Sequence, residues 1–141
     1  MKNFISATTG YAIAFSLLGS IIVFPLTSSA GDFSVEFDWG DLKKCTTGRP
    51  NTVSNPLFTL SNVPDGTKFL KFRMRDNNAP GYNHGGGKIE YTGDNVIQPG
   101  AFKYKSPCPP RGVHTYVWTV TAQSKKSGGK LGSANASKKY P

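Results

Sequence analysis

The sequence predicts an all-β protein, an antiparallel β-sandwich with Greek-key-like connections. Apolar and polar residues alternate in several short runs, which is the period of a strand with one buried face. Pro, Gly, Asn and Asp separate these runs at short intervals, as expected for turns. After residue 30, no segment shows the apolar period of an amphipathic helix.

Residues 1–30 have the three-part layout of a secretory signal peptide. Lys2 precedes an apolar run from Tyr11 to Phe24, and Ser28-Ser29-Ala30 supplies a small-residue cleavage site. A membrane anchor is the alternative, but spanning a bilayer takes about 20 apolar residues and this run is shorter. We therefore expect cleavage after Ala30 and a secreted or periplasmic protein without a stable membrane anchor.

The exported part is long enough for one domain, which we place at residues 31–122. Lys2 is the one basic residue in the signal peptide and all 8 acidic residues follow it, so the net charge of +9 becomes +8 on cleavage. Such a charge favours anionic partners. Nucleic acid is not expected outside the cell, and residues 123–141 are polar and Gly/Ser-rich, which predicts a flexible basic tail.

Cys45 and Cys108 are the two cysteines of the chain. In an oxidising compartment an even count favours a disulfide over a metal pair or a catalytic thiol. Such a bridge would tie the Pro-rich loop around Cys108 to the N-terminal part of the domain.

The expected strands are separated by turn signals. The segment 43–56 is predicted to be a loop, and Pro64-Asp65-Gly66 has the composition of a tight turn. Apolar alternation or short apolar runs predict strands at Phe33–Phe37, Leu57–Leu60, Lys68–Arg75, Lys88–Thr92, Val96–Ile97 and Val113–Ala122.

The last of these strands carries a polar and aromatic face. His114, Tyr116, Trp118 and Val120 share one face because side chains alternate along a strand. His114 and Tyr116 are either hydrogen-bonded core residues or the floor of a small polar pocket beside the Pro107-Cys108-Pro109-Pro110 segment.

Further candidates lie upstream. Asp76 either caps a turn or contributes a carboxylate, and His84 is either a surface residue or a ligand contact. A carboxylate and two histidines are also compatible with a hydrolase, but Ser106 beside a proline and an oxidised Cys108 are poor nucleophiles. No metal-ligand spacing or phosphate-binding loop is present. We expect a binding protein without a cofactor, not an enzyme.

Several segments in this order resemble the phosphatidylethanolamine-binding protein family, including its bacterial Raf-kinase-inhibitor-like members. The resemblance spans residues 55–122: Asn-Pro-Leu-Phe-Thr-Leu-Ser-Asn-Val-Pro-Asp-Gly-Thr-Lys, then Asp76 to Pro80, His84, the Pro-Cys-Pro-Pro segment and Gly112 to Trp118. It implies a β-sandwich with a small pocket for phosphate or phospholipid head groups. Some family members inhibit kinases or proteases. The C-terminal helix of the family has no counterpart after Ala122.

The resemblance also assigns the pocket residue by residue. Asp76 matches the first acid and Pro80 the final proline of the family's Asp-Pro-Asp-x-Pro motif, whose second acid is replaced by Asn78. Thr115 replaces the arginine of the His-Arg-Tyr motif. The implied ligand-binding residues are Asp76, Asn78, Pro80, His84, Pro110, His114 and Tyr116.

These observations together predict an exported protein that binds a small anion, either a phospholipid head group or a phosphorylated small molecule. The alternative is an inhibitor or adaptor whose basic surface engages a protein partner, as in kinase or protease inhibition.

Overall fold

A computed structural model describes residues 31–141, so the predicted signal peptide lies outside the described residues. The prediction of an all-β fold is confirmed, and residues 31–141 contain no helix. Hence none of the described residues belongs to a helix able to cross a membrane. The described strands are β1 (Ser34–Asp38), β2 (Thr52–Ser54), β3 (Leu57–Ser61), β4 (Phe69–Asp76), β5 (Gly86–Glu90), β6 (Val96–Ile97), β7 (Lys103–Lys105), β8 (His114–Gln123) and β9 (Lys130–Tyr140).

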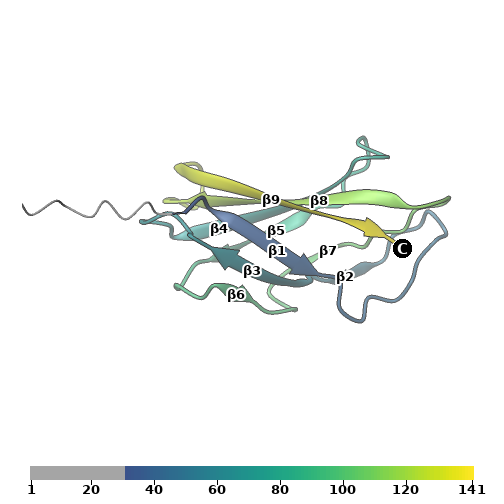
Figure 1. The fold of residues 1–141 in the computed structure, drawn as a ribbon, viewed down its shortest axis with the longest axis horizontal. Coiled ribbons are helices and arrows are strands. Elements are labelled where there is room, and N and C mark those ends of the chain that lie inside the picture. Colours follow the sequence, from purple (N-terminus) through teal and green to yellow (C-terminus); the bar gives the residue numbers. More distant parts are fainter. Residues whose placement is uncertain (1–30) are drawn as a thin grey trace, which may run out of the picture.

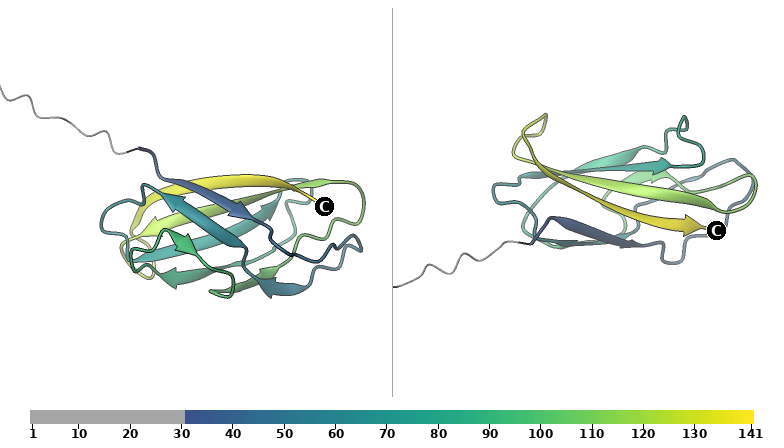
Figure 2. Two further views of the ribbon diagram at one scale, coloured as in Figure 1. Left: turned by 60° about the horizontal axis from the view of Figure 1, so that its bottom comes forward. Right: turned by 45° about the horizontal axis from the view of Figure 1, so that its top comes forward.

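The strands form two facing layers (Figures 1 and 2). One layer is a four-stranded sheet in the order β5-β4-β8-β9. The other contains the three-stranded sheet β1-β3-β6 and the two-stranded sheet β2-β7. All strand pairs are antiparallel. The layers meet along their sides, where β1 contacts β9 and β5 contacts β7.

Alternation along the strands places the apolar side chains between the layers. In β4, Leu70, Phe72 and Met74 are buried, whereas Lys71, Arg73 and Arg75 are exposed, as the sequence predicts. β8 continues this core with four buried residues at alternate positions, and β1 and β3 complete it from the other layer. The buried residues of these three strands are Tyr116, Trp118, Val120 and Ala122, Val35 and Phe37, and Phe58 and Leu60.

Trp118 lies at the centre of the core and is fully buried. Its ring is 4.9 Å from the ring of Tyr104 and 5.2 Å from that of Phe58, in edge-to-face arrangements. Such geometry is favourable between aromatic rings. Because Phe58 belongs to β3 and Trp118 to β8, these contacts join the two layers.

The prediction of a flexible tail at residues 123–141 is wrong. Residues 130–140 form β9, which pairs with β8 from His114 to Gln123. The strand buries Ala134 and Tyr140 against the core and exposes most of its other side chains. Its polar composition therefore reflects a strand at the side of a sheet with one solvated face.

The predicted loop at residues 43–56 is also partly wrong, because it contains the short strand β2. Val53 of β2 lies opposite Tyr104 of β7, and this pair positions the segment that leads into the Pro-rich loop. Strand β7 was not predicted either, since its three residues form too short a run to show alternation.

Glycines at the start of β5 allow close packing. A Cβ atom on Gly86, whose φ is 152°, would overlap the carbonyl group of Phe72 in β4. A Cβ atom on Gly87 would overlap the ring of Phe102, which packs 4.9 Å from that of Phe72. These two positions therefore require glycine, and Gly86 leaves the outer surface of the sheet without a side chain at the start of β5.

Candidate functional site

A cavity of about 210 Å³ lies at one end of the sandwich, where β4 ends and β8 begins. Three segments supply its walls: the loop before β2, the loop between β4 and β5, and the Pro-rich loop with the start of β8. The lining residues are Gly48, Pro50, Asp76, Ala79, Tyr82, His84, Cys108, Pro109, Pro110, His114 and Tyr116.

Asp76 orients His114 within this cavity. The His114 Nδ1 atom lies 2.7 Å from the Asp76 Oδ2 atom, which accepts its hydrogen bond. The other carboxylate oxygen, Oδ1, accepts hydrogen bonds from the backbone N–H groups of Asn78 and Ala79 at 2.8 and 3.2 Å. Asp76 thus both caps the turn after β4 and fixes the imidazole, whose Nε2 atom is left for a ligand.

The Asp76 carboxyl is held in its ionised form although only 3% of the residue is exposed. Burial opposes ionisation, but the hydrogen bonds from His114 and the Asn78 N–H group outweigh it and hold the pKa of Asp76 below its usual 3.8. At neutral pH the ionised Asp76 carboxylate therefore accepts the hydrogen bond from His114 and keeps its ring in place.

His84 approaches the cavity from the loop between β4 and β5. Its Nδ1 atom lies 2.8 Å from the carbonyl oxygen of Lys105 and donates a hydrogen bond to it, which again leaves Nε2 unoccupied. Burial lowers the pKa of His84, and the interactions that stabilise its protonated form, chiefly with the Lys105 carbonyl, compensate only in part. In the unliganded protein His84 is thus a neutral imidazole.

Two tyrosines complete the aromatic part of the wall. The Tyr116 ring lies 5.4 Å from the ring of His84 and 6.2 Å from that of His114. Burial, together with the nearby Asp76 carboxylate, raises the pKa of Tyr116, so its hydroxyl stays protonated. Tyr82 lies edge-on to His84 at 4.6 Å and is itself 43% exposed, which places it at the mouth of the cavity.

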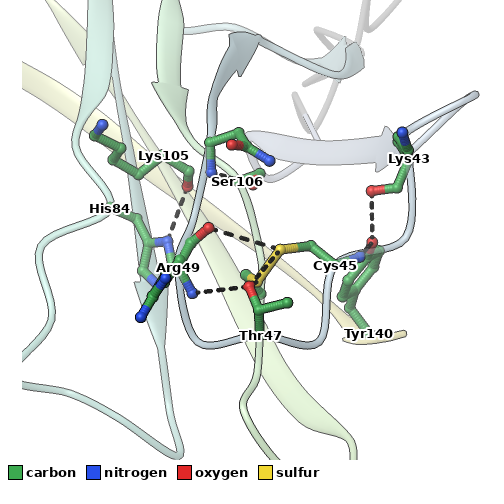
Figure 3. The surroundings of a disulfide bond; sticks show 10 residues. Lys43, Cys45, Thr47, Arg49, His84, Lys105, Ser106 and Tyr140 are labelled. Carbon is green, nitrogen blue, oxygen red and sulfur yellow. Dashed lines mark hydrogen bonds between the residues drawn. A yellow bond between two sulfur atoms is a disulfide. The ribbon is translucent and has the colours of Figure 1, made fainter.

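The predicted disulfide between Cys45 and Cys108 is confirmed, and it contributes to the cavity wall. Cys108 lines the cavity directly, and Gly48 and Pro50 follow Cys45 on the bridged loop. The Thr47 hydroxyl lies 3.5 Å from the Cys108 sulfur atom (Figure 3). The bridge therefore holds the loop at residues 45–50 against the Pro-rich loop.

Tyr140 at the end of β9 anchors the same loop. Its hydroxyl accepts a hydrogen bond from the backbone N–H group of Cys45 at 3.0 Å and donates one to the Lys43 carbonyl at 3.1 Å (Figure 3). The segment predicted to be a flexible tail thus supports the pocket wall.

The structure brings together five of the seven candidate ligand-binding residues around the cavity: Asp76, His84, Pro110, His114 and Tyr116. Asn78 and Pro80 are not among the lining residues, and Ala79 takes the position between them. The Asn78 Oδ1 atom instead accepts a hydrogen bond from the Thr115 backbone N–H group at 2.8 Å, so this side chain joins the β4–β5 loop to β8.

Sequence reasoning missed four lining residues: Gly48, Pro50, Ala79 and Tyr82. The predicted disulfide carried a signal for the first two, because residues close to Cys45 must lie close to the Pro-rich loop. Ser106, the nucleophile considered for a hydrolase, is buried and is not among the lining residues. Its hydroxyl oxygen accepts a hydrogen bond from the Asn51 N–H group at 3.1 Å.

Acid is expected to weaken the fold through His84. The unfolded chain binds a proton on this residue near pH 6.5, whereas the folded chain binds it only at lower pH. The free energy of unfolding therefore falls as the pH drops below about 6.5 and through the folded pKa. Melting temperatures at pH 7.5 and 5.0 measure this loss. The His84→Asn variant, which keeps a donor for Lys105 but does not titrate, should show a smaller decline; an equal decline would contradict the assignment.

Comparison with known proteins gives a fold but no sequence match. No protein-family model matches the chain, and no curated protein matches it in sequence. The structure is similar to that of CT736 from Chlamydia trachomatis, described as a homolog of phosphatidylethanolamine-binding protein, with a TM-score of 0.56 and 15% identity. It is also similar to YbcL of E. coli, described as a new member of the mammalian family of that name, with a TM-score of 0.57 and 17% identity.

Both similarities extend over the whole domain. The matches cover 78% of this chain in each case, and 97% of the Chlamydia protein and 98% of the E. coli protein. The chain therefore has the fold of the phosphatidylethanolamine-binding proteins, as the sequence predicts. At these identities the similarity establishes the fold alone.

Proposed function

We propose that the protein binds a small anionic ligand in the cavity at the end of β4 and β8, and that the bound group is a phosphate ester. The observation that carries this proposal is the convergence of two imidazoles on one cavity, each with its Nδ1 atom already occupied and its Nε2 atom left over. A phospholipid head group and a phosphorylated small molecule share the chemistry that such a site recognises.

The electrostatics of the site suit an anion with several oxygens. When His114, whose Nδ1 atom is held by the Asp76 carboxylate, also carries a proton on Nε2, it donates a charge-assisted hydrogen bond to the anion. Neutral His84 accepts a hydrogen bond at Nε2 and therefore suits a phosphate oxygen that still carries a proton. On protonation His84 becomes a second donor. Pro109 and Pro110 supply an apolar wall that shields these hydrogen bonds from water.

Two properties of the whole chain support the same proposal. The excess of 17 basic over 8 acidic residues raises the local concentration of anions around the protein. The disulfide is consistent with an oxidising compartment, in agreement with the predicted export to the periplasm or the medium.

Replacing His114 is expected to weaken phosphate binding at least about tenfold. His114→Ala removes one charge-assisted hydrogen bond, worth roughly 1.5–3 kcal/mol. The protein contains two histidines and both line the cavity, so their ring C–H signals in NMR report binding directly. Titrations with inorganic phosphate, glycerophosphoethanolamine and a sugar phosphate measure the affinities and separate the two sources of the ligand.

Thr115→Ala is the matched control, because Thr115 lies next to His114 on β8 but belongs to the opposite face of the sheet. This variant should bind phosphate as the native protein does. Equal affinity of the His114→Ala and native proteins, or no binding by either, would refute the proposal. Capture of a protein partner that survives His114→Ala would favour the inhibitor or adaptor alternative.

A further inference from the structure

The outer face of the four-stranded sheet is strongly basic. Lys71, Arg73 and Arg75 follow one another at alternate positions of β4, so their Cα atoms are about 7 Å apart along the strand. Neighbouring strands add three more cations, Lys88, Lys130 and Lys139, and all six side chains are exposed. Among the described residues, Glu90 is the one acidic side chain on this outer basic face.

A hollow of about 300 Å³ lies within the outer basic face, across β4 and β8. It is lined by the cations Lys71, Arg73 and Lys130 and by the polar side chains of Thr119, Thr121 and Gln123. This hollow contains no residue of the phosphate pocket. It offers lysine and arginine side chains beside threonine hydroxyl groups, whereas the phosphate pocket contains neither lysine nor arginine.

Gln123 gives independent reason to place a ligand here. The residue is only 7% exposed, and its Nε2 group donates a hydrogen bond to the Gly128 carbonyl at 3.2 Å. Its Oε1 atom has no hydrogen-bond partner among the described residues. Buried polar atoms are normally paired, so a rotation of this side chain toward the hollow would gain a hydrogen bond from a ligand hydroxyl group.

A second hollow, of about 270 Å³, adjoins the first one. Both hollows are lined by Lys71 and Arg73. The second hollow is also lined by Lys88 and Asn83 and by the glycines at and before the start of β5. The two hollows thus flank the same pair of cations, and together they offer room for a ligand that extends across three strands.

We propose that the outer basic face binds an acidic oligosaccharide, with its sulfate or carboxylate groups at Lys71 and Arg73 and its hydroxyl groups at Thr121 and Gln123. Charge complementarity and the unpaired acceptor both select a ligand that is anionic and rich in hydroxyl groups. Nucleic acid fits less well, because single strands bind through stacking on exposed aromatic rings. The exposed large hydrophobic residues, Tyr82, Val96, Val113 and Leu131, do not line either hollow, so an inserted lipid surface fits less well too.

The test uses the full chain with a heparin hexasaccharide, neutral maltohexaose, and phosphatidylcholine vesicles containing phosphatidylglycerol. Calorimetry should show that Lys71→Gln/Arg73→Gln binds the heparin hexasaccharide roughly tenfold more weakly than the native protein, because two charge-assisted contacts are lost. Lys44→Gln/Lys103→Gln removes the same charge from exposed positions outside this sheet and should have little effect. The side-chain amide signals of Gln123 should shift on titration.

The His114→Ala variant should bind the heparin hexasaccharide as tightly as the native protein, which separates this site from the phosphate pocket. Equal weakening by the two lysine and arginine pairs would overturn the proposal, since it would reduce the effect to net charge. Equally tight binding of maltohexaose would overturn it as well. Vesicle binding that depends on Lys71 and Arg73 without hexasaccharide binding would replace it with a membrane surface.

Discussion

A chain that ends at Gly129 is expected not to fold. This truncation removes β9, which pairs along the whole of β8 and places Ala134 and Tyr140 in the core. Loss of one large buried aromatic side chain alone costs about 3–5 kcal/mol. The truncation also exposes the side of β8, whose backbone groups then have no partner strand. Together these losses are comparable with the roughly 5–15 kcal/mol by which domains are typically stable, so we expect the truncated chain to be unfolded.

Urea denaturation followed by circular dichroism tests this expectation. The truncated chain should show no cooperative transition, whereas the full chain should show one. The control is Lys125→Ala/Lys126→Ala in the turn before β9, which removes exposed side chains and keeps the strand. A truncated chain with the same denaturation midpoint as the full chain would show that residues 130–140 contribute nothing to the fold.

The sequence was sufficient for the fold class because alternation is a local signal. In β4, every second side chain is apolar, so the buried face of the strand is visible without knowledge of its partners. In β9, the inward positions include small residues such as Gly132, Ala134 and Ala136. Their inward direction follows from pairing with β8, a tertiary property that no local pattern contains.

In the candidate site, too, some features were predictable from the sequence and others required the three-dimensional structure. His114 and Tyr116 share a face because they lie two positions apart on one strand, and Asp76 pairs with Tyr116 across the sheet. The sequence order and the family resemblance were sufficient to group these residues. The wall around Gly48 and Pro50 depends on the disulfide and on the hydroxyl of Tyr140, so it required the three-dimensional structure.

Removing the disulfide is expected to destabilise the domain by about 4 kcal/mol and to open the phosphate pocket. The bridge joins residues 63 positions apart, and the entropy of closing a loop of this length in the unfolded chain gives that magnitude. In the folded protein the bridge also holds Gly48 and Pro50 against the Pro-rich loop. The Cys45→Ala/Cys108→Ala variant should therefore lose stability and phosphate affinity together.

Two measurements separate these effects. Urea denaturation gives the loss of stability, and phosphate titration in the absence of urea, on protein shown to be folded by near-ultraviolet circular dichroism, gives the loss of affinity. Tyr140→Phe is the matched variant, because it keeps the disulfide and the buried ring but removes the hydroxyl that holds Lys43 and Cys45. If phosphate binding requires the loop to be held by both the disulfide and the Tyr140 hydroxyl, Tyr140→Phe lowers phosphate affinity. Its cost in stability, about 1–3 kcal/mol, should be smaller than that of removing the disulfide. A double cysteine variant that binds phosphate like the native protein would show that the side chains on β4 and β8 suffice without the bridged loop.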